Sequence, residues 1–177
     1  ALLCITDATG IAFASHDYPF ASKGIQASKN LGSCGEGLVI GYEKTFDCRD
    51  AALINGLLIH GLDYDDTHSE SVIHATSSSL PTVIAGAQIW DATPSELLLA
   101  YIIGVETSAR IGLISGGKFQ QAGFHPTGLI GTFGSTLAAS KIAELSIPQI
   151  VSAQGIALSM ASGSMQFLED GSWTKRI

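Results

Sequence analysis

Apolar residues recur at helical spacing along most of the chain. The pattern predicts helices over residues 2–15, 20–31, 49–61, 79–90, 94–115, 127–143 and 147–162. Two of the predicted starts carry a capping box, in which Thr93 and Ser146 each stand three residues before a Glu or Gln, with a proline between. Long helices joined by short polar links indicate an all-α domain.

The stretch from residue 32 to residue 47 departs from the helical pattern. Three glycines surround the β-type run at residues 38–40, and the following residues 42–46 alternate between polar and apolar character. A small β-hairpin near residues 37–47 is therefore expected within the otherwise helical fold.

The first concentration of polar side chains follows the helix predicted at 49–61. One face of that helix is formed by Ala52, Leu53, Gly56, Leu57 and His60. If the helix continues to residue 67, Asp63 and Thr67 share a face, where a carboxylate beside a hydroxyl would orient a substrate or a histidine. Asp65 and Asp66 then point elsewhere, and the simpler interpretation for both is that they stay solvated or cap a helix end.

The second cluster surrounds His125, which stands just before a predicted helix cap at Thr127. Free backbone N–H groups and the helix dipole attract an anion at such a position. A single histidine is more often structural than catalytic, so both interpretations stay open on position alone. Glycines at 128, 131 and 134 predict a small-residue ridge that lets a neighbouring helix approach closely.

The third cluster, residues 169–176, contributes the adjacent cations Lys175 and Arg176; taken alone, it is equally well a solvated loop. Asp63, His74, His125 and Lys175 together would form an anion-binding pocket with acid and base groups. Serine-hydrolase, zinc-protease and phosphate-loop motifs are missing from the sequence, and its His and Asp spacing matches no standard metal pattern. Neither a metal nor a cofactor is predicted.

Composition narrows the classes of protein. The 177 residues are 46% hydrophobic and 14% charged, with a formal net charge of -7, which fits neither a disordered chain nor a sequence-independent nucleic-acid binder. The most apolar run, residues 97–105, is bracketed by two glutamates, so no membrane-spanning helix and no membrane partner are predicted. The three scattered cysteines predict reduced, mostly buried thiols in a cytoplasmic protein.

The three clusters, in this order, resemble the MmgE/PrpD family, which includes 2-methylcitrate dehydratases, cis-aconitate decarboxylases and iminodisuccinate epimerases. The resemblance covers nearly the whole chain. It rests on Asn55-Gly56 through His60, on residues 62–67 with His74, on residues 123–128 with 131–134, and on Ala161 through Asp170-Gly171 to Lys175 and Arg176.

The resemblance implies a predominantly helical domain, a homodimer, no metal, and a pocket for small di- or tricarboxylates. Carried over by position, the residues that line this pocket are Asp63, Thr67, His74, His125 and Lys175. His74 and His125 are the candidate proton donors, and Lys175 would hold a carboxylate. Members of the family also carry a second α+β lid domain, so residues 1–177 are expected to be the helical domain, truncated at both ends and inactive without that lid.

The leading hypothesis is a cofactor-independent lyase of the 2-methylcitrate dehydratase type. His125 or His74 would move a proton at a carbon beside a carboxylate, while Lys175 and the helix start near Thr127 hold carboxylate charge. Asp63 would orient a histidine or accept a hydrogen bond from the substrate, with Thr67 beside it. A decarboxylase or epimerase using the same residues, and a non-catalytic helical binding or oligomerisation module, are the alternatives.

Overall fold

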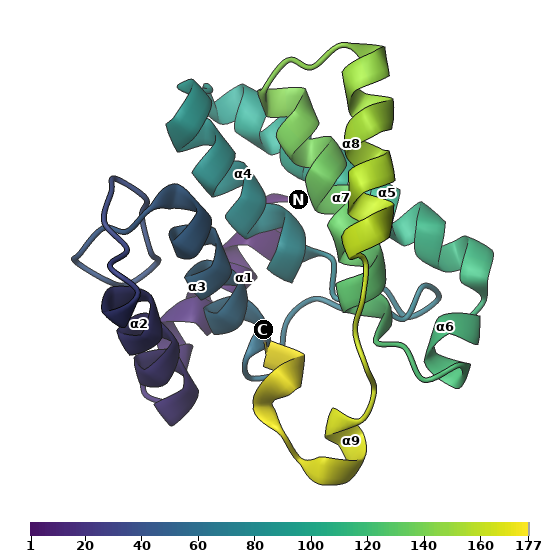
Figure 1. The fold of residues 1–177 in the computed structure, drawn as a ribbon, viewed down its shortest axis with the longest axis horizontal. Coiled ribbons are helices and arrows are strands. Elements are labelled where there is room, and N and C mark those ends of the chain that lie inside the picture. Colours follow the sequence, from purple (N-terminus) through teal and green to yellow (C-terminus); the bar gives the residue numbers. More distant parts are fainter. Residues whose placement is uncertain (177) are drawn as a thin grey trace.

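A computed structural model describes residues 1–176 as a helical domain (Figure 1). Within these residues the elements are α1 (Leu2–Ser15), α2 (Pro19–Asn30), α3 (Cys48–His60), α4 (Thr76–Trp90), α5 (Pro94–Ser115), α6 (Lys118–Gln121), α7 (Pro126–Ile142), α8 (Ile147–Met160), α9 (Phe167–Asp170) and the 3-10 turn η1 (Trp173–Arg176). The only β contacts in this part of the chain are isolated bridges, which confirms the all-α class.

Each of the long helices packs against one or more of the others, and together they surround one main core. α1 and α2 lie against α3, α3 against α4, α4 against α5 and α7, and α7 against α8 (Figure 1). The core at the junction of α3, α4 and α5 contains fully buried side chains, among them Ile54, Leu58, Val83 and Tyr101. Both predicted capping boxes are confirmed, at Thr93 and Ser146.

The predicted glycine ridge lies where α7 meets α4 and α5. A Cβ atom on Gly134 would overlap the Gly104 carbonyl and the Ser108 side chain of α5, and one on Gly131 would come within 2.8 Å of Ser78 Oγ of α4. Only glycine allows these backbones to approach so closely. The ridge therefore fixes the position of α7, whose first residues belong to the site described below.

The predicted hairpin is wrong. Residues 37–47 contain a single bridge, in which Gly37 and Phe46 exchange two backbone hydrogen bonds of 2.7 and 3.0 Å. The groups that would extend the ladder are taken by the buried Asn55 of α3. Its Oδ1 accepts from the Ile40 amide (2.8 Å) and its Nδ2 donates to the Leu38 carbonyl (2.9 Å). Pairing with α3 thus replaces pairing between strands.

The first polar cluster also differs from prediction, because α3 ends at His60 and does not continue to Thr67. Gly61 follows as the C-cap, and Asp63 then takes the left-handed conformation, with φ of 56°. α4 begins at Thr76, three residues before its predicted start. On α3, Leu53 is 52% exposed rather than part of the buried face.

Much apolar surface stays exposed in this chain. α8 buries only Ala157, while Ile147, Val151, Leu158 and Met160 are exposed. α5 is the one described helix that length and composition would allow to cross a membrane, where the sequence predicted none; its most apolar window is 33% buried in the fold. The expectation of mostly buried cysteines is wrong, because Cys34 is exposed and the other two are half-buried.

Candidate active site

The C-terminal segment, residues 161–176, returns to the region where α3, α4 and α7 approach one another (Figure 1). It passes the start of α7, where the His125 amide donates to the Gly163 carbonyl (3.1 Å). Arg176 Nε then donates to the Gly61 carbonyl at the end of α3 (2.7 Å). These bonds bring the third polar cluster of the sequence against the first.

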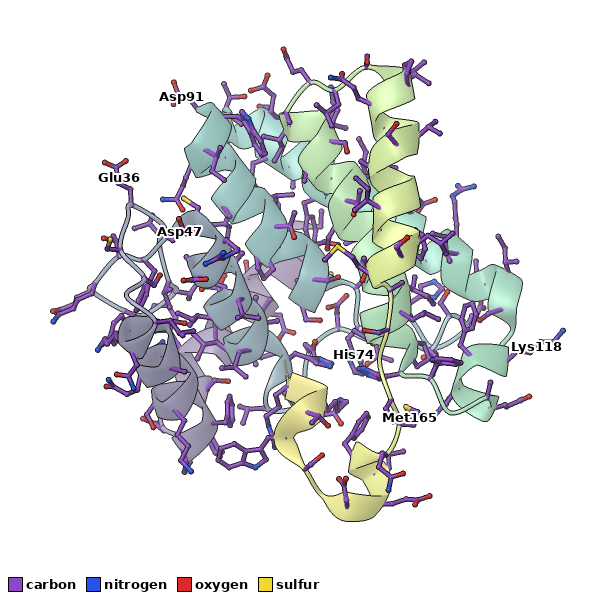
Figure 2. The ribbon with its side chains drawn as sticks, in the orientation of Figure 1. Glu36, Asp47, His74, Asp91, Lys118 and Met165 are labelled. Carbon is purple, nitrogen blue, oxygen red and sulfur yellow. The ribbon has the colours of Figure 1, made fainter. Side chains whose placement is uncertain are left out.

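Asp63, His74 and Lys175 meet at this junction. Lys175 Nζ forms an ion pair with Asp63 Oδ1, and His74 Nε2 lies 3.5 Å from the same oxygen. The left-handed turn at Asp63 is a conformation that Asp tolerates better than most residues, and it follows directly on the end of α3. Figure 2 places His74 near the foot of α4 and close to the C-terminal segment. The structure therefore brings three of the four predicted catalytic residues into contact.

Asp65 faces Nδ1, the other ring nitrogen of His74, and its side chain is completely buried. Its Oδ2 accepts a hydrogen bond from His60 Nδ1 (2.9 Å), and its Oδ1 lies 3.3 Å from His74 Nδ1. The expectation that Asp65 is solvated or caps a helix is therefore wrong. The charge tolerates burial because both imidazoles compensate it.

Asp66, the neighbouring carboxylate, binds the start of a helix. It is half-buried, and its Oδ1 accepts a hydrogen bond from the Thr76 amide at the start of α4 (3.1 Å). Burial raises the pKa of Asp66, against the opposing effect of the hydrogen bonds from Thr76. Asp66 thus binds the first amide of α4 from the preceding loop, whereas the N-cap residue of α4 itself is Ala75.

His125, the fourth predicted catalytic residue, stands on the other side of His60. Its ring stacks on His60 at a centroid distance of 5.7 Å and meets the edge of the Phe167 ring at 5.3 Å. The residue is 8% exposed. His60 also packs edge-on against His74, at a centroid distance of 5.0 Å, so the His60 ring contacts the rings of both other histidines.

The two predicted threonines both contact His74, but not in the expected way. Thr67 is outside any helix, and its Oγ1 lies 3.4 Å from His74 Nδ1. The prediction that Thr127 caps α7 is wrong, because Pro126 is already the first helical residue and His125 is the N-cap. The buried Thr127 Oγ1 accepts instead from the His74 amide (3.0 Å), which fixes the backbone of His74.

A small cavity of about 220 Å³ opens beside these groups, between the end of α3 and the C-terminal segment. Its lining includes His60, Asp63, Phe167, Lys175 and Arg176. Ligand sites for drug-sized molecules are larger, from about 300 Å³ upward, so this volume suits a compact metabolite. A larger hollow of about 480 Å³ lies between α5, α7 and the start of α8, and contains none of the predicted site residues.

The surroundings of His74 and His125 shift the pKa values of these two histidines in opposite directions. The hydrogen bond to Asp65 raises the pKa of His74, although partial burial opposes this effect. Burial lowers the pKa of His125 to about 4, and the neighbouring His60, Lys175 and His74 add to the shift. Burial alone would raise the pKa of Asp65, but hydrogen bonds from both imidazoles hold it below its usual range. Near neutral pH, His125 is therefore in the neutral form, and His74 holds its proton to a higher pH than an ordinary histidine.

Comparison with known proteins places this chain in a family. The model of the MmgE/PrpD N-terminal domain matches residues 1–177. The chain belongs to the MmgE/PrpD family. This family consists of carboxylate lyases that act on small carboxylates, as the resemblance in the sequence predicted.

Several curated MmgE/PrpD relatives are cis-aconitate decarboxylases. The enzyme of Aspergillus terreus is 30% identical over 179 residues, which cover 98% of this chain and 36% of the relative. The cis-aconitate decarboxylase-like protein oryM of Aspergillus oryzae is 31% identical over 165 residues, covering 89% and 33%. The human enzyme is 35% identical over 120 residues, covering 65% and 25%. The chain thus spans about a third of the length of the first two relatives.

Two residues at the centre of this candidate site, His60 and Asp65, were not among its predicted members. The helical face that contains His60 was visible in the sequence, but a histidine on an apolar face gives no sign of its partner. Asp65 was assigned away from the site because the helix was extended past its actual end at His60. Phe167 was also missed, and Arg176 was noted as a cation beside Lys175 but not assigned to the site, since the contacts of both residues join segments far apart in the chain.

His60, Asp65 and His74 are also the described residues best placed to hold a metal ion, with ligand atoms all within 4.8 Å of one another. Imidazole and carboxylate groups suit several transition metals. The hydrogen bond from His60 Nδ1 to Asp65 Oδ2 and the 3.3 Å contact between His74 Nδ1 and Asp65 Oδ1 account for this spacing without an ion. That the MmgE/PrpD site of this chain needs no metal stays a prediction.

Proposed function

We propose that the protein is a lyase that removes a small group from a di- or tricarboxylate at the junction of α3, α4, α7 and the C-terminal segment. The observation that carries this proposal is the meeting of Lys175, Asp63 and His74 beside a small cavity. An ammonium group has three donors, and Asp63 occupies one of them. The remaining donors of Lys175, with the guanidinium of Arg176, would bind substrate carboxylates.

Decarboxylation of a substrate like cis-aconitate is the reaction that the relatives support. In this reaction the bond between carbon and a carboxyl group breaks and carbon dioxide leaves. The electron pair stays on the remaining carbon skeleton, which then accepts one proton. His74, with its raised pKa and its Nε2 toward Asp63 and Lys175, would supply that proton.

Dehydration is the second candidate, and the lowered pKa of His125 favours it. A neutral imidazole would remove a proton from the carbon beside a carboxylate, while His74 protonates the departing hydroxyl group so that it leaves as water. Two groups with pKa values pushed apart are suited to act as base and acid in this way. The assay must therefore follow both reactions.

The test is to express the intact gene product and offer it cis-aconitate, 2-methylcitrate, citrate and iminodisuccinate. Carbon dioxide release, dehydration and epimerisation are followed separately. We expect lyase turnover with at least one substrate, and a loss of about 10²- to 10⁴-fold in kcat for His74→Asn. His68→Gln, at an exposed histidine, is the matched control and should keep normal turnover.

Several outcomes would overturn parts of this proposal. No turnover with any of the four carboxylates would favour a non-catalytic helical module. Unchanged turnover in both His74→Asn and His125→Asn would remove the acid and base assignment. Loss of activity on chelation, restored by a divalent metal, would assign the group of His60, Asp65 and His74 to an ion.

We also propose a homodimer, as the resemblance implies. The exposed apolar side chains Val151 and Leu158 of α8 support an interface at this helix. Sedimentation of the intact protein tests this, and a monomer at micromolar concentration would contradict it. Leu158→Glu should shift the equilibrium toward monomer if α8 forms the interface.

A further inference from the structure

One buried carboxylate serves two histidines in this site. The side chain of Asp65 is 0% exposed, and its two oxygens face different rings, Oδ2 toward His60 Nδ1 (2.9 Å) and Oδ1 toward His74 Nδ1 (3.3 Å). An ionised carboxylate only accepts hydrogen bonds. His60 Nδ1, which is hydrogen-bonded to Oδ2, must therefore carry a proton. His74 Nδ1 approaches Oδ1 as an ion-pair contact and also lies 3.4 Å from the Asp65 backbone carbonyl, and both of these acceptors favour a proton on Nδ1.

This arrangement fixes how His74 is presented. With the proton of the neutral ring held on Nδ1, the other nitrogen, Nε2, is the atom that exchanges protons with its surroundings. Nε2 lies 3.5 Å from Asp63 Oδ1, the oxygen that also binds Lys175 Nζ, and both Asp63 and Lys175 line the cavity. A ring turned the other way would direct its exchangeable proton into the protein.

His60 completes the arrangement from the far side. It occupies Asp65 Oδ2 and so leaves Oδ1 facing His74. Asp65 Oδ1 and the Nε2 of His60 are both buried without a hydrogen-bond partner among the described residues. That Nε2 is shielded from solvent, and the ring lies between those of His74 and His125. His60 is thus placed to act through Asp65.

We propose that Asp65 is a positioning residue, braced by His60, that holds the His74 ring in the orientation and tautomer required for proton transfer at Nε2. The inference rests on the proposed function for the role of His74. Thr67 also approaches His74 Nδ1, at 3.4 Å, but the residue is exposed. Asp63 faces Nε2 and is 59% exposed, so Asp65 is the fully buried carboxylate that contacts the ring.

Asp65→Asn tests the role in catalysis. An asparagine amide has a single acceptor oxygen, so one of the two imidazoles would face an NH₂ group and change its tautomer. We expect kcat to fall about 10²- to 10³-fold with KM changed less than about threefold, because the carboxylate-binding cations stay in place. Asp66→Asn is the matched control, since Asp66 bonds the Thr76 amide and forms no hydrogen bond to either imidazole. An equal loss in both variants would overturn the proposal.

The tautomer of His74 gives a readout that does not depend on activity. In intact protein labelled with ¹⁵N-histidine, the His74 signals are assigned by their loss in His74→Asn, and the ring is observed at a pH where it is neutral. We expect the proton on Nδ1 in the wild type. A proton on Nε2 would overturn the positioning role even if Asp65→Asn does not fold. A protein with the Nδ1 tautomer and no lyase turnover would instead contradict the proposed function alone.

Two substitutions of His60 test the brace. His60→Asn keeps a donor near the position of Nδ1, whereas His60→Leu keeps bulk and removes the donor. We expect His60→Asn to retain at least about tenfold more of the wild-type kcat than His60→Leu, since loss of a hydrogen bond to a charged group has an effect of about this size. Equal losses in the two variants would show that His60 does not act through its bond to Asp65.

Discussion

His74 and His125 illustrate how two identical side chains acquire opposite properties. His74 faces Asp65 and Asp63, whose negative charges favour the imidazolium form. His125 packs between His60 and Phe167, and no carboxylate of residues 1–176 forms an ion pair or hydrogen bond with its ring, so burial and nearby cations favour its neutral form. The difference is a property of the surroundings, because the two residues have the same pKa in an unfolded chain.

The lowered pKa of His125 predicts a loss of stability in mild acid. The unfolded chain binds a proton at this residue near pH 6.5, whereas the folded chain resists protonation until about pH 4. The free energy of unfolding should therefore decrease as the pH falls from 6.5 to 4, at up to about 1.4 kcal/mol per pH unit for this one proton. Urea unfolding of His125→Gln should give a shallower pH dependence in this window.

The raised pKa of His74 acts in a different window. The stabilising effect of His74 is fully present below pH 6.5 and disappears as the pH rises through the pKa of His74 in the folded protein. It therefore does not change the pH dependence of the free energy of unfolding predicted for His125 between pH 6.5 and 4. His68→Gln, at an exposed histidine, is the control and should keep the wild-type slope. The same slope in His125→Gln and the wild type would contradict the assignment of a buried neutral ring.

Lys175 is expected to contribute to substrate binding more than to the chemical step. Lys175→Met keeps the length of the side chain and removes its charge. A hydrogen bond to a charged group contributes about 1.5–3 kcal/mol, so KM for a carboxylate substrate should rise about 10- to 150-fold with a smaller change in kcat. Steady-state kinetics measure both constants. Lys118→Met, at an exposed lysine of α6, should leave KM unchanged, and an unchanged KM in Lys175→Met would remove Lys175 from the binding site.

At the level of helices, the position of α7 depends on the absence of side chains. α7 contacts α5 and α4 through glycines and small residues, and it begins at the site with His125 and Thr127. Because a methyl group on Gly134 would overlap the Gly104 carbonyl, a backbone would have to move to accommodate it. Packing far from the cavity therefore determines where His125 lies.

Gly134→Ala should destabilise the fold, because its Cβ would overlap the Gly104 carbonyl and Ser108 of α5. Overpacking of this kind costs about 1–3 kcal/mol, which urea unfolding measures. The matched control is Gly155→Ala on α8, where no atom lies within 4 Å of the added Cβ. That change should stabilise the protein by about 0.5–1 kcal/mol, since alanine is the better helix former. Equal effects at the two glycines would contradict the close approach of α5 and α7.

At the level of the whole molecule, the site exists because the C-terminal segment folds back on the first half of the domain. Lys175 lies 112 residues from Asp63 in sequence, and Arg176 lies 115 residues from Gly61. The same segment places Phe167 against His125 and so removes that ring from water. Docking of the segment thus sets both the charge at the cavity and the pKa of a candidate base.

Phe167→Ala should raise the pKa of His125 from about 4 toward its unfolded value of 6.5, because burial is the largest cause of the shift. NMR titration of labelled histidine measures the change. Leu168→Ala, at a neighbouring side chain that is 68% exposed, should leave the pKa in place. A pKa that does not move in Phe167→Ala would show that the C-terminal segment does not control the environment of His125.

The helices themselves were largely predictable from the sequence. The starts at Thr93 and Ser146 and the glycine ridge of α7 follow from side chains three or four positions apart, and such local signals act in the same way wherever the helix is placed. The boundary after α3 was misplaced because its stop depends on Gly61 and on the left-handed Asp63, whose conformation nothing in the helical period indicates.

For the site, the sequence by itself determined which chemical groups are present: Asp63, His74, His125 and Lys175 were identified, and the structure brings the first, second and fourth into contact. Only the tertiary structure decided that Asp65 is buried between two imidazoles, that Thr127 bonds the backbone of His74, and that His60 separates His74 from His125. The physical reason is distance along the chain. Periodicity and capping act over a few residues, whereas burial and charge at this site arise from segments up to 115 residues apart, which only packing brings together.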